Sequence, residues 1–260
     1  ALPEILVGGD SINYAAGSAT DPARPTVLMI HGAGQSIATW SNQLELLRDD
    51  PRYNVIAIDL PGHGSSEGEG FRSAEGYKGF IGEFTRALGL GEIIPVGHSM
   101  GGAVAMLYAL DYPESVRALG LAGTGARLRV SPETLKTVKS DYKLFCDVSP
   151  GRMIAESSPD EVRREFREGL LRTSPEVCYR DLIACDEFDI MDRVHEIKAP
   201  AFIVSAELDL LAPPKYGEYL NSSIRGSVYH IINGAGHFMM LEKPLEFNEI
   251  LSGCLTNISS

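Results

Sequence analysis

Residues 93–109 read IIPVGHSMGGAVAMLYA, and this stretch constrains the fold more than any other part of the chain. The apolar, β-branched run at 93–96 predicts a buried strand, and the Ala-rich segment after it predicts a helix. Between them lies a G-x-S-x-G sequence centred on Ser99, typical of a nucleophilic serine on a sharp strand-to-helix turn. Gly97 and Gly101 suit that turn because side chains there would collide with neighbouring backbone. A phosphate-binding glycine loop is the alternative, but neither of its common sequence patterns overlaps this motif.

A serine nucleophile needs a base, and the chain offers six histidines: His31, His63, His98, His195, His230 and His237. The first two lie in glycine-rich loops upstream of the serine, and His98, next to Ser99, should point elsewhere. His195 lies in a charged segment, and His230 lies inside an apolar run. His237 follows a predicted strand and a tight Asn-Gly-Ala-Gly loop. Because catalytic groups of a parallel sheet gather beyond the carboxyl ends of its strands, we predict His237 as the base.

The carboxylate that would orient this histidine is predicted by the same reasoning. Residues 201–205 form an apolar run typical of a buried strand, and Asp209 lies on the loop that follows it. Glu207 is a rival only two residues away. We favour Asp209 because of its spacing from the strand and because Pro213 suits the first turn of the next helix.

Five segments in this order resemble the α/β-hydrolase family over nearly the full length of the chain. The oxyanion loop resembles His31-Gly32-Ala33-Gly34, the D-x-x-G-x-G-x-S segment resembles residues 59–66, and the serine elbow resembles residues 97–102. The acid loop resembles Glu207-Leu208-Asp209 with Pro213, and the histidine loop resembles residues 234–238 followed by Glu242-Lys243-Pro244. The family often has Gly where Ala206 stands, and we expect Ala to be tolerated there.

The resemblance implies a role for each site residue. Ser99 would attack a carbonyl carbon, His237 would take its proton and return it to the leaving group, and Asp209 would hold the imidazole tautomer. The backbone N–H groups of Ala33 and Met100 would bind the oxyanion, with Gly34 a poorer substitute. No metal and no other cofactor is expected. His31 and His63 are interpreted as structural residues that brace a loop and a turn.

Predicted strands and helices alternate along the chain, so we expect an α/β fold with a mostly parallel sheet covered on both faces. Strands are predicted at 26–30, 54–58, 93–96, 116–121, 201–205 and 228–232, with helices near 40–47, 74–88, 102–110, 214–220 and 245–255. Residues 10–15 should add an antiparallel edge strand. The predicted division is a hydrolase core at 1–124 and 195–260 with a helical cap subdomain at 125–194.

The cap prediction depends on four Ser-Pro pairs, which suit the starts of helices, at Ser131, Ser149, Ser158 and Ser174. Ser158 also has capping-box spacing to Glu161. We therefore expect four short helices over the carboxyl edge of the sheet. An unstructured excursion is the alternative, and the apolar content of the segment argues against it.

The substrate pocket is predicted to be mostly apolar. Candidates are Gly34, Trp40, Phe145, Met153, Leu211 and Phe238, with Phe166, Leu170, Phe188 and Met191 as further cap residues and Met100 and Met239 beside the catalytic positions. Trp40 is either a cover over the oxyanion loop or an anchor at a helix start. Each cap residue could instead pack between the cap helices.

Composition excludes several partners. The chain has 23 Lys and Arg against 35 Asp and Glu, a formal charge of −12, which disfavours nucleic acid and anionic membranes. No transmembrane segment and no signal peptide is expected, although a removed leader stays possible because the chain does not begin with Met. The four cysteines lack metal-site spacing, so free thiols and a cytoplasmic location are expected. The oligomeric state is not determined.

The leading functional hypothesis is a serine esterase that cleaves a small carboxylic ester through an acyl-enzyme on Ser99. Lactone hydrolysis and carbon–carbon bond hydrolysis use the same triad and stay open. Lyases of the menaquinone pathway also resemble the chain but need a cationic cap pocket, while haloalkane dehalogenases are disfavoured because their nucleophile is aspartate. The alternative of another class is a small-molecule sensor that uses the pocket without turnover. The predicted partner in each enzymatic case is a small-molecule acyl substrate.

Overall fold

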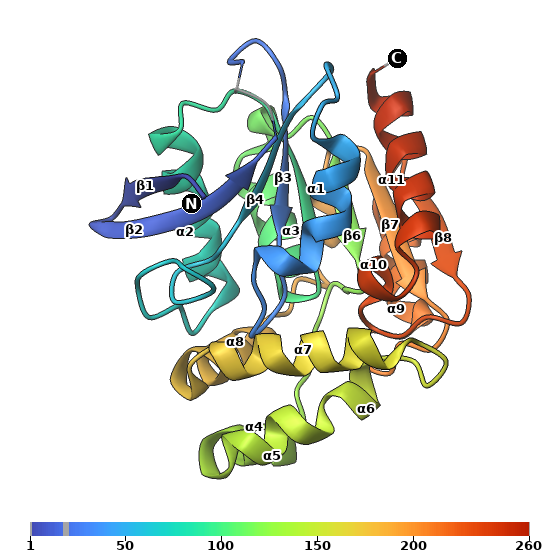
Figure 1. Cartoon of the computed structure of the whole chain (residues 1–260). Coiled ribbons are helices and arrows are strands. Elements are labelled where there is room, and N and C mark those ends of the chain that lie inside the picture. Colours follow the sequence, from blue (N-terminus) through green and yellow to red (C-terminus); the bar gives the residue numbers. More distant parts are fainter. Residues whose placement is uncertain (1, 18–20, 260) are drawn as a thin grey trace.

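A single eight-stranded sheet organises the computed structural model, which describes residues 2–17 and 21–259. The strand order is β1-β2-β4-β3-β5-β6-β7-β8, and β3 to β8 are parallel (Figure 1). The bounds are β1 Glu4–Val7, β2 Asp10–Ala16, β3 Thr26–Ile30, β4 Asn54–Ile58, β5 Ile93–His98, β6 Leu119–Ala122, β7 Ala201–Ala206 and β8 Val228–Ile232. Buried on both faces, β3 to β7 consist almost wholly of apolar residues, as a doubly covered parallel sheet requires.

The edge of the sheet and the start of β6 differ most from the prediction. Residues 10–16 do pair antiparallel, but β1 pairs with their outer side and takes the edge of the sheet, so β2 lies one position inside it. β6 begins at Leu119 instead of residue 116, because Val116 forms only an isolated bridge to Ile93.

Helices cover both faces of this sheet. Two separate apolar clusters result, one under α2, α3 and α9 and the other under α1, α10 and α11. The bounds are η1 Ile37–Trp40, α1 Ser41–Leu47, α2 Ala74–Ala87, α3 Met100–Asp111, η2 Pro113–Ser115, η3 Val194–Glu196, α9 Pro214–Ser223, α10 Met239–Glu242 and α11 Pro244–Ser259. In α2, Ser73 caps the first turn and the buried residues Tyr77, Ile81 and Phe84 lie on one face. Throughout the described ranges, no helix has both the length and the apolar character needed to cross a membrane.

Five further helices, here called the cap helices, lie beyond the carboxyl ends of the parallel strands (Figure 1). They are α4 Pro132–Ser140, α5 Tyr142–Val148, α6 Pro150–Met153, α7 Asp160–Arg172 and α8 Pro175–Glu187. The prediction of four was wrong because Asp141 ends α4 and caps α5, a start without the Ser-Pro signal. The predicted capping box is also absent, since Pro159 is the N-cap of α7 and the Ser158 hydroxyl bonds Glu242 instead.

Candidate active site

Ser99 occupies a strained turn between β5 and α3. Its φ of 52° and ψ of −115° make it the one non-glycine residue with positive φ in the described part of the chain. A Cβ at Gly97 would lie 2.2 Å from the Gly101 carbonyl oxygen, and one at Gly101 would lie 2.2 Å from the Ile30 carbonyl oxygen. Both glycines are therefore required by close backbone packing. Holding a serine in this conformation costs about 1–3 kcal/mol, which fits a functional site.

His237 and Asp209 form a buried hydrogen-bonded pair beyond β8 and β7. The His237 Nδ1 lies 2.7 Å from Asp209 Oδ2, and the N–H groups of Leu211 and Ala212 donate to Asp209 Oδ1 at 2.8 and 2.9 Å. Burial opposes ionisation of Asp209, but His237 and these N–H donors together hold the pKa of its carboxyl below the usual value. Since a carboxylate only accepts, the His237 proton sits on Nδ1 and leaves Nε2 free to take a proton. Glu207, the rival carboxylate, is exposed and accepts the Gly234 N–H instead.

The loop that carries His237 is held by the cap helices and by α10. The His237 N–H donates to the Met153 carbonyl at 2.7 Å, at the end of α6. The buried Glu242 carboxylate accepts the N–H groups of Gly236, Phe238 and Ala155 at 2.8 to 3.1 Å. The position of the imidazole therefore depends on contacts from residues far away in the sequence.

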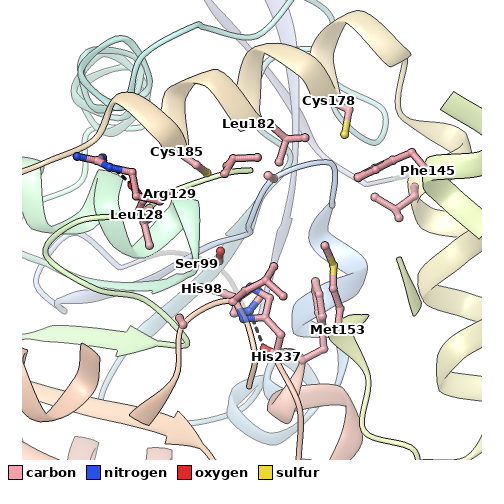
Figure 2. A pocket seen from close by; sticks show the side chains of 16 residues that line it. His98, Ser99, Leu128, Arg129, Phe145, Met153, Cys178, Leu182, Cys185 and His237 are labelled. Atoms are coloured by element: carbon pink, nitrogen blue, oxygen red, sulfur yellow. Dashed lines mark hydrogen bonds between the residues drawn. The ribbon is translucent and has the colours of Figure 1, made fainter. Parts of the chain in front are cut away.

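Ser99 and His237 open into one narrow cavity of about 80 Å³ between the sheet and the cap helices (Figure 2). Cys178, Leu182 and Cys185 project into it from α8, on the side opposite His237 (Figure 2). The other lining residues are Ala33, His98, Leu128, Arg129, Val130, Phe145, Met153, Leu170, Leu211, Ala212 and Phe238. Most of this surface is apolar, and the acyl part of a substrate fits its character.

Four of the six predicted pocket residues line this cavity, namely Phe145, Met153, Leu211 and Phe238. The predictions for Gly34 and Trp40 were wrong. Trp40 is fully buried and packs against Phe247 of α11, so it is the anchor and not the cover. Gly34 is covered by the side chains of Leu170 and Cys178.

Among the further candidates, Leu170 lines the cavity, whereas Phe166 packs behind Phe238, with ring centroids 4.6 Å apart. The side chains of Met100, Phe188 and Met239 lie in the apolar clusters of the core, and Met191 borders a separate hollow beside α9.

The oxyanion loop follows β3 and faces Ser99. Ala33 lines the cavity, and its N–H has no acceptor among the described residues, while Met100 begins α3, where helix N–H groups lack partners within the helix. The Gly34 N–H donates to Asp181 at 2.8 Å and is not available to a substrate. His31 braces this loop as predicted: its Nε2 accepts the Leu60 N–H and its Nδ1 donates to the Gly32 carbonyl.

The pKa values of the two remaining buried histidines shift in opposite directions. Burial and the nearby His237 lower the pKa of His98 to about 3, and its neutral ring donates from Nε2 to the His237 carbonyl at 2.9 Å. Burial also opposes charge on His63, but the Asp181 carboxylate outweighs burial and raises the pKa of His63. His195 is exposed and His230 lies in β8.

Arg129 is the charged side chain at the cavity, and its guanidinium is already engaged. It donates to the carbonyls of Leu128 and Asp186 at 2.8 and 2.7 Å and pairs with the Asp189 carboxylate at 3.1 Å. The guanidinium points away from Ser99 (Figure 2). Among the described residues that line the cavity, no Lys, Asp or Glu is present, so a negatively charged substrate group would find no free cation there.

Two buried polar residues of the site, Thr173 and Asp181, were missed in the sequence, and Glu242 was named in the histidine-loop segment without a role. Asp181 carried a usable signal. It shares the inner face of α8 with Cys178, Leu182 and Cys185, and a carboxylate in an apolar stripe is buried and paired. Thr173 carried no comparable signal, and the role of Glu242 was not predictable, since the partners of both are fixed only by the tertiary structure.

Fold and site together define the class of protein, because a strained Ser99 turn and an Asp209–His237 pair meet at the carboxyl edge of a mostly parallel sheet. The sequence model of the Alpha/beta hydrolase family matches residues 27–250, so the chain belongs to this family and is a hydrolase.

Relatives and solved structures agree with this membership. A thermophilic esterase is 34% identical, with a TM-score of 0.85 over 98% of this chain and 97% of the esterase. A 2-hydroxy-6-oxo-6-phenylhexa-2,4-dienoate hydrolase of Comamonas testosteroni is 29% identical over 86% of this chain and 85% of its own length. The enol-lactonase of Burkholderia xenovorans LB400, at 24% identity and a TM-score of 0.88, covers 98% of this chain and all of its own, and shares the fold.

Proposed function

We propose that the chain is a serine hydrolase that cleaves small, uncharged carboxylic esters through an acyl-enzyme on Ser99. The observation that carries this proposal is the 2.7 Å contact between Asp209 and His237 at the cavity that also contains Ser99. The similarity to a thermophilic esterase at 34% identity supports the same reaction class.

The mechanism follows from the direction of each hydrogen bond. The Ser99 hydroxyl adds to the ester carbonyl carbon while its proton passes to His237 Nε2, and Asp209 stabilises the resulting imidazolium. The carbonyl oxygen becomes an anion that the N–H groups of Ala33 and Met100 bind, each contributing about 3–4 kcal/mol to the transition state. His237 then protonates the departing alcohol. Water deprotonated by His237 releases the acid from Ser99 in the second half of the reaction.

Within the described part of the chain, the cavity lacks a free cation for a substrate carboxylate, and this favours an uncharged ester over a dienoate that is cleaved at a carbon–carbon bond. The Comamonas testosteroni relative is named for a dienoate, which carries a carboxylate. In this chain the only charged side chain among the described residues that line the cavity is Arg129, and its guanidinium is already engaged by backbone carbonyls and by Asp189, which Arg127 also contacts. Desolvating a substrate carboxylate without a partner is costly, so uncharged acyl groups are favoured. Uncharged lactones meet the same condition and form the second candidate substrate class.

A substrate panel tests this proposal. Rates are measured for p-nitrophenyl esters of increasing chain length, an uncharged lactone, a thioester and 2-hydroxy-6-oxo-6-phenylhexa-2,4-dienoate, with Ser99→Ala as the blank. We expect short esters to give the highest kcat/KM and the dienoate the lowest. A dienoate rate above every ester would replace the ester proposal with carbon–carbon hydrolysis. Fluorophosphonate labelling of Ser99 with no turnover of any compound would favour a sensor.

The location stays a prediction. Each of the four cysteines is a buried free thiol, which supports a reducing compartment such as the cytoplasm.

A further inference from the structure

The cap helices hold the peptide groups on both sides of Gly34, in the loop that faces Ser99. The Asp181 Oδ2 of α8 accepts the Gly34 N–H at 2.8 Å, and the Thr173 hydroxyl, at the end of α7, donates to the Gly34 carbonyl at 3.0 Å. Both side chains are buried, at 0% and 4% exposed. Gly34 therefore has its hydrogen bonds satisfied by the cap helices, not by the loop that contains it.

These two contacts act on a turn with two available states. The Gln35 N–H donates to the Gly32 carbonyl at 3.3 Å, and Gly34 has a φ of +67°, which together define a type II turn over residues 32–35. Rotation of the Ala33–Gly34 peptide plane would convert this turn to type I and turn the Gly34 N–H away from Asp181. The buried acceptor on Asp181 thus selects one orientation of the peptide that follows Ala33. The Ala33 N–H belongs to the preceding peptide, so Asp181 and Thr173 restrain it only through the position of the turn that both peptides share.

Asp181 is itself fixed by two residues of the core. Its Oδ2 also lies 2.7 Å from His63 Nε2, and its Oδ1 accepts the Tyr77 hydroxyl of α2. The His63 Nδ1 faces the Pro61 carbonyl at 3.1 Å, so both ring nitrogens face acceptors, an arrangement that the imidazolium form satisfies. His63, Tyr77 and Asp181 are all fully buried. Three donors converge on one carboxylate, and removing it would leave all three buried without a partner.

We propose that Asp181 and Thr173 are positioning residues that make docking of the cap helices a condition for an assembled oxyanion hole. This inference rests on the proposed serine mechanism. Neither side chain is among the described residues that line the cavity, so neither contributes to substrate binding directly. Their effect belongs in the transition state, where the Ala33 N–H meets the oxyanion, and it lowers kcat and not KM when lost.

Variants of Thr173 provide the cleanest experiment. Thr173→Val keeps the shape but removes the donor to the Gly34 carbonyl, whereas Thr173→Ser keeps the donor. We expect Thr173→Val to lower kcat about tenfold with KM changed less than threefold, a fraction of the loss for a direct oxyanion donor. Thr173→Ser restores most of kcat. Asp181→Asn should lower kcat further, since an amide cannot accept from all three donors at once.

An exposed cap carboxylate serves as the matched control. Asp147 of α5 pairs with Lys143 at 2.7 Å and also with Arg167, and it contacts no residue of the oxyanion loop. Asp147→Asn makes the same chemical change at a cap carboxylate that does not touch the loop, and kcat should stay within twofold of the parent. Thermal melting of every variant establishes that the protein compared is folded.

A transition-state analogue separates positioning from general loss of structure. The inhibitor is a trifluoromethyl ketone with the preferred acyl chain. The Ser99 oxygen adds to its carbonyl carbon, the C=O electron pair moves to the ketone oxygen, and the serine proton passes to His237. Its Ki should rise in Thr173→Val by the factor by which kcat falls, while the Ki of the matching secondary alcohol stays unchanged. A fall in kcat without a rise in the ketone Ki, an equal rise in both Ki values, or an unchanged kcat in a folded Asp181→Asn would overturn this inference. Failure of the serine mechanism is recognised separately, as an active Ser99→Ala.

Discussion

Replacement of Asp209 by asparagine tests the serine mechanism at its most specific point. In the structure Asp209 Oδ1 accepts two N–H groups, from Leu211 and Ala212, and Oδ2 contacts His237 Nδ1. An asparagine must keep its carbonyl oxygen toward the two donors, so its NH₂ group faces His237. The His237 Nδ1 then has to accept, and the ring proton moves to Nε2, where the Ser99 proton should go.

The expected loss is large because the wrong tautomer stops proton transfer while the geometry persists. We expect kcat/KM to fall about 10⁴-fold, equivalent to about 5 kcal/mol of transition-state stabilisation. Initial rates with a short p-nitrophenyl ester measure this loss, with Ser99→Ala as the blank. Since asparagine is isosteric, the melting temperature reports whether the variant is folded.

Glu207→Gln is the matched control, because Glu207 is an exposed carboxylate two residues away whose side chain accepts the Gly234 N–H at 2.9 Å. Its kcat/KM should stay within about threefold of the parent, as is usual for exposed substitutions. The reasoning fails if folded Asp209→Asn keeps more than a tenth of the parent activity, or if Glu207→Gln loses as much.

Three further predictions concern strain, pH and acyl selectivity. Ser99→Ala and Ser99→Gly should both lose activity, by about 10⁶-fold for Ala. The free energy of unfolding of Ser99→Gly should exceed that of Ser99→Ala by about 1 kcal/mol, because φ at this position is 52°. Equal melting temperatures of the two variants would mean that the turn is unstrained. Because the Asp181 carboxylate raises the pKa of His63, the charged His63 ring stabilises the fold. This stabilisation is complete below about pH 6.5, the ordinary pKa of histidine, and is lost as pH rises through the raised pKa of His63. His31 and Tyr77 are the other titratable rings packed against His63. The free-energy gap between parent and His63→Gln in urea titrations should therefore shrink from pH 6 to pH 9, and a constant gap contradicts the assignment. Phe145→Ala should raise the ratio of octanoyl to butyryl ester kcat/KM about tenfold by lengthening the cavity, whereas an unchanged ratio would place the acyl chain elsewhere.

Much of the sheet was predictable because its determinants are local. A strand buried on both faces in a parallel sheet is a continuous apolar run, and the runs at 26–30 and 54–58 agree with β3 and β4 to the residue. The run at 228–232 also agrees with β8 to the residue, although β8 is an edge strand with exposed positions. The edge strand β1 was missed because only four residues form it and half of them are exposed, which leaves a weak pattern.

The site was predictable only in part. The Ser99 turn is encoded by two glycines that no other residue can replace. His237 was left after elimination because it follows a strand and a tight loop downstream of the serine, whereas His31 and His63 lie in loops upstream of it. The side chain of Met100 was misassigned to the ligand because proximity along the chain does not fix direction. In α3 it points into the core and is fully buried, while its backbone N–H lies at the helix start.

The sequence by itself determined the order of strands and helices, the serine turn and the chemical type of each catalytic group, since period, turn geometry and residue type act over a few neighbours. Only the tertiary structure decided which carboxylate serves His237 and which residues hold Gly34. The Gly34–Asp181 contact joins residues 147 positions apart. Such a pairing depends on how the cap helices dock onto the sheet, and no local pattern specifies that docking.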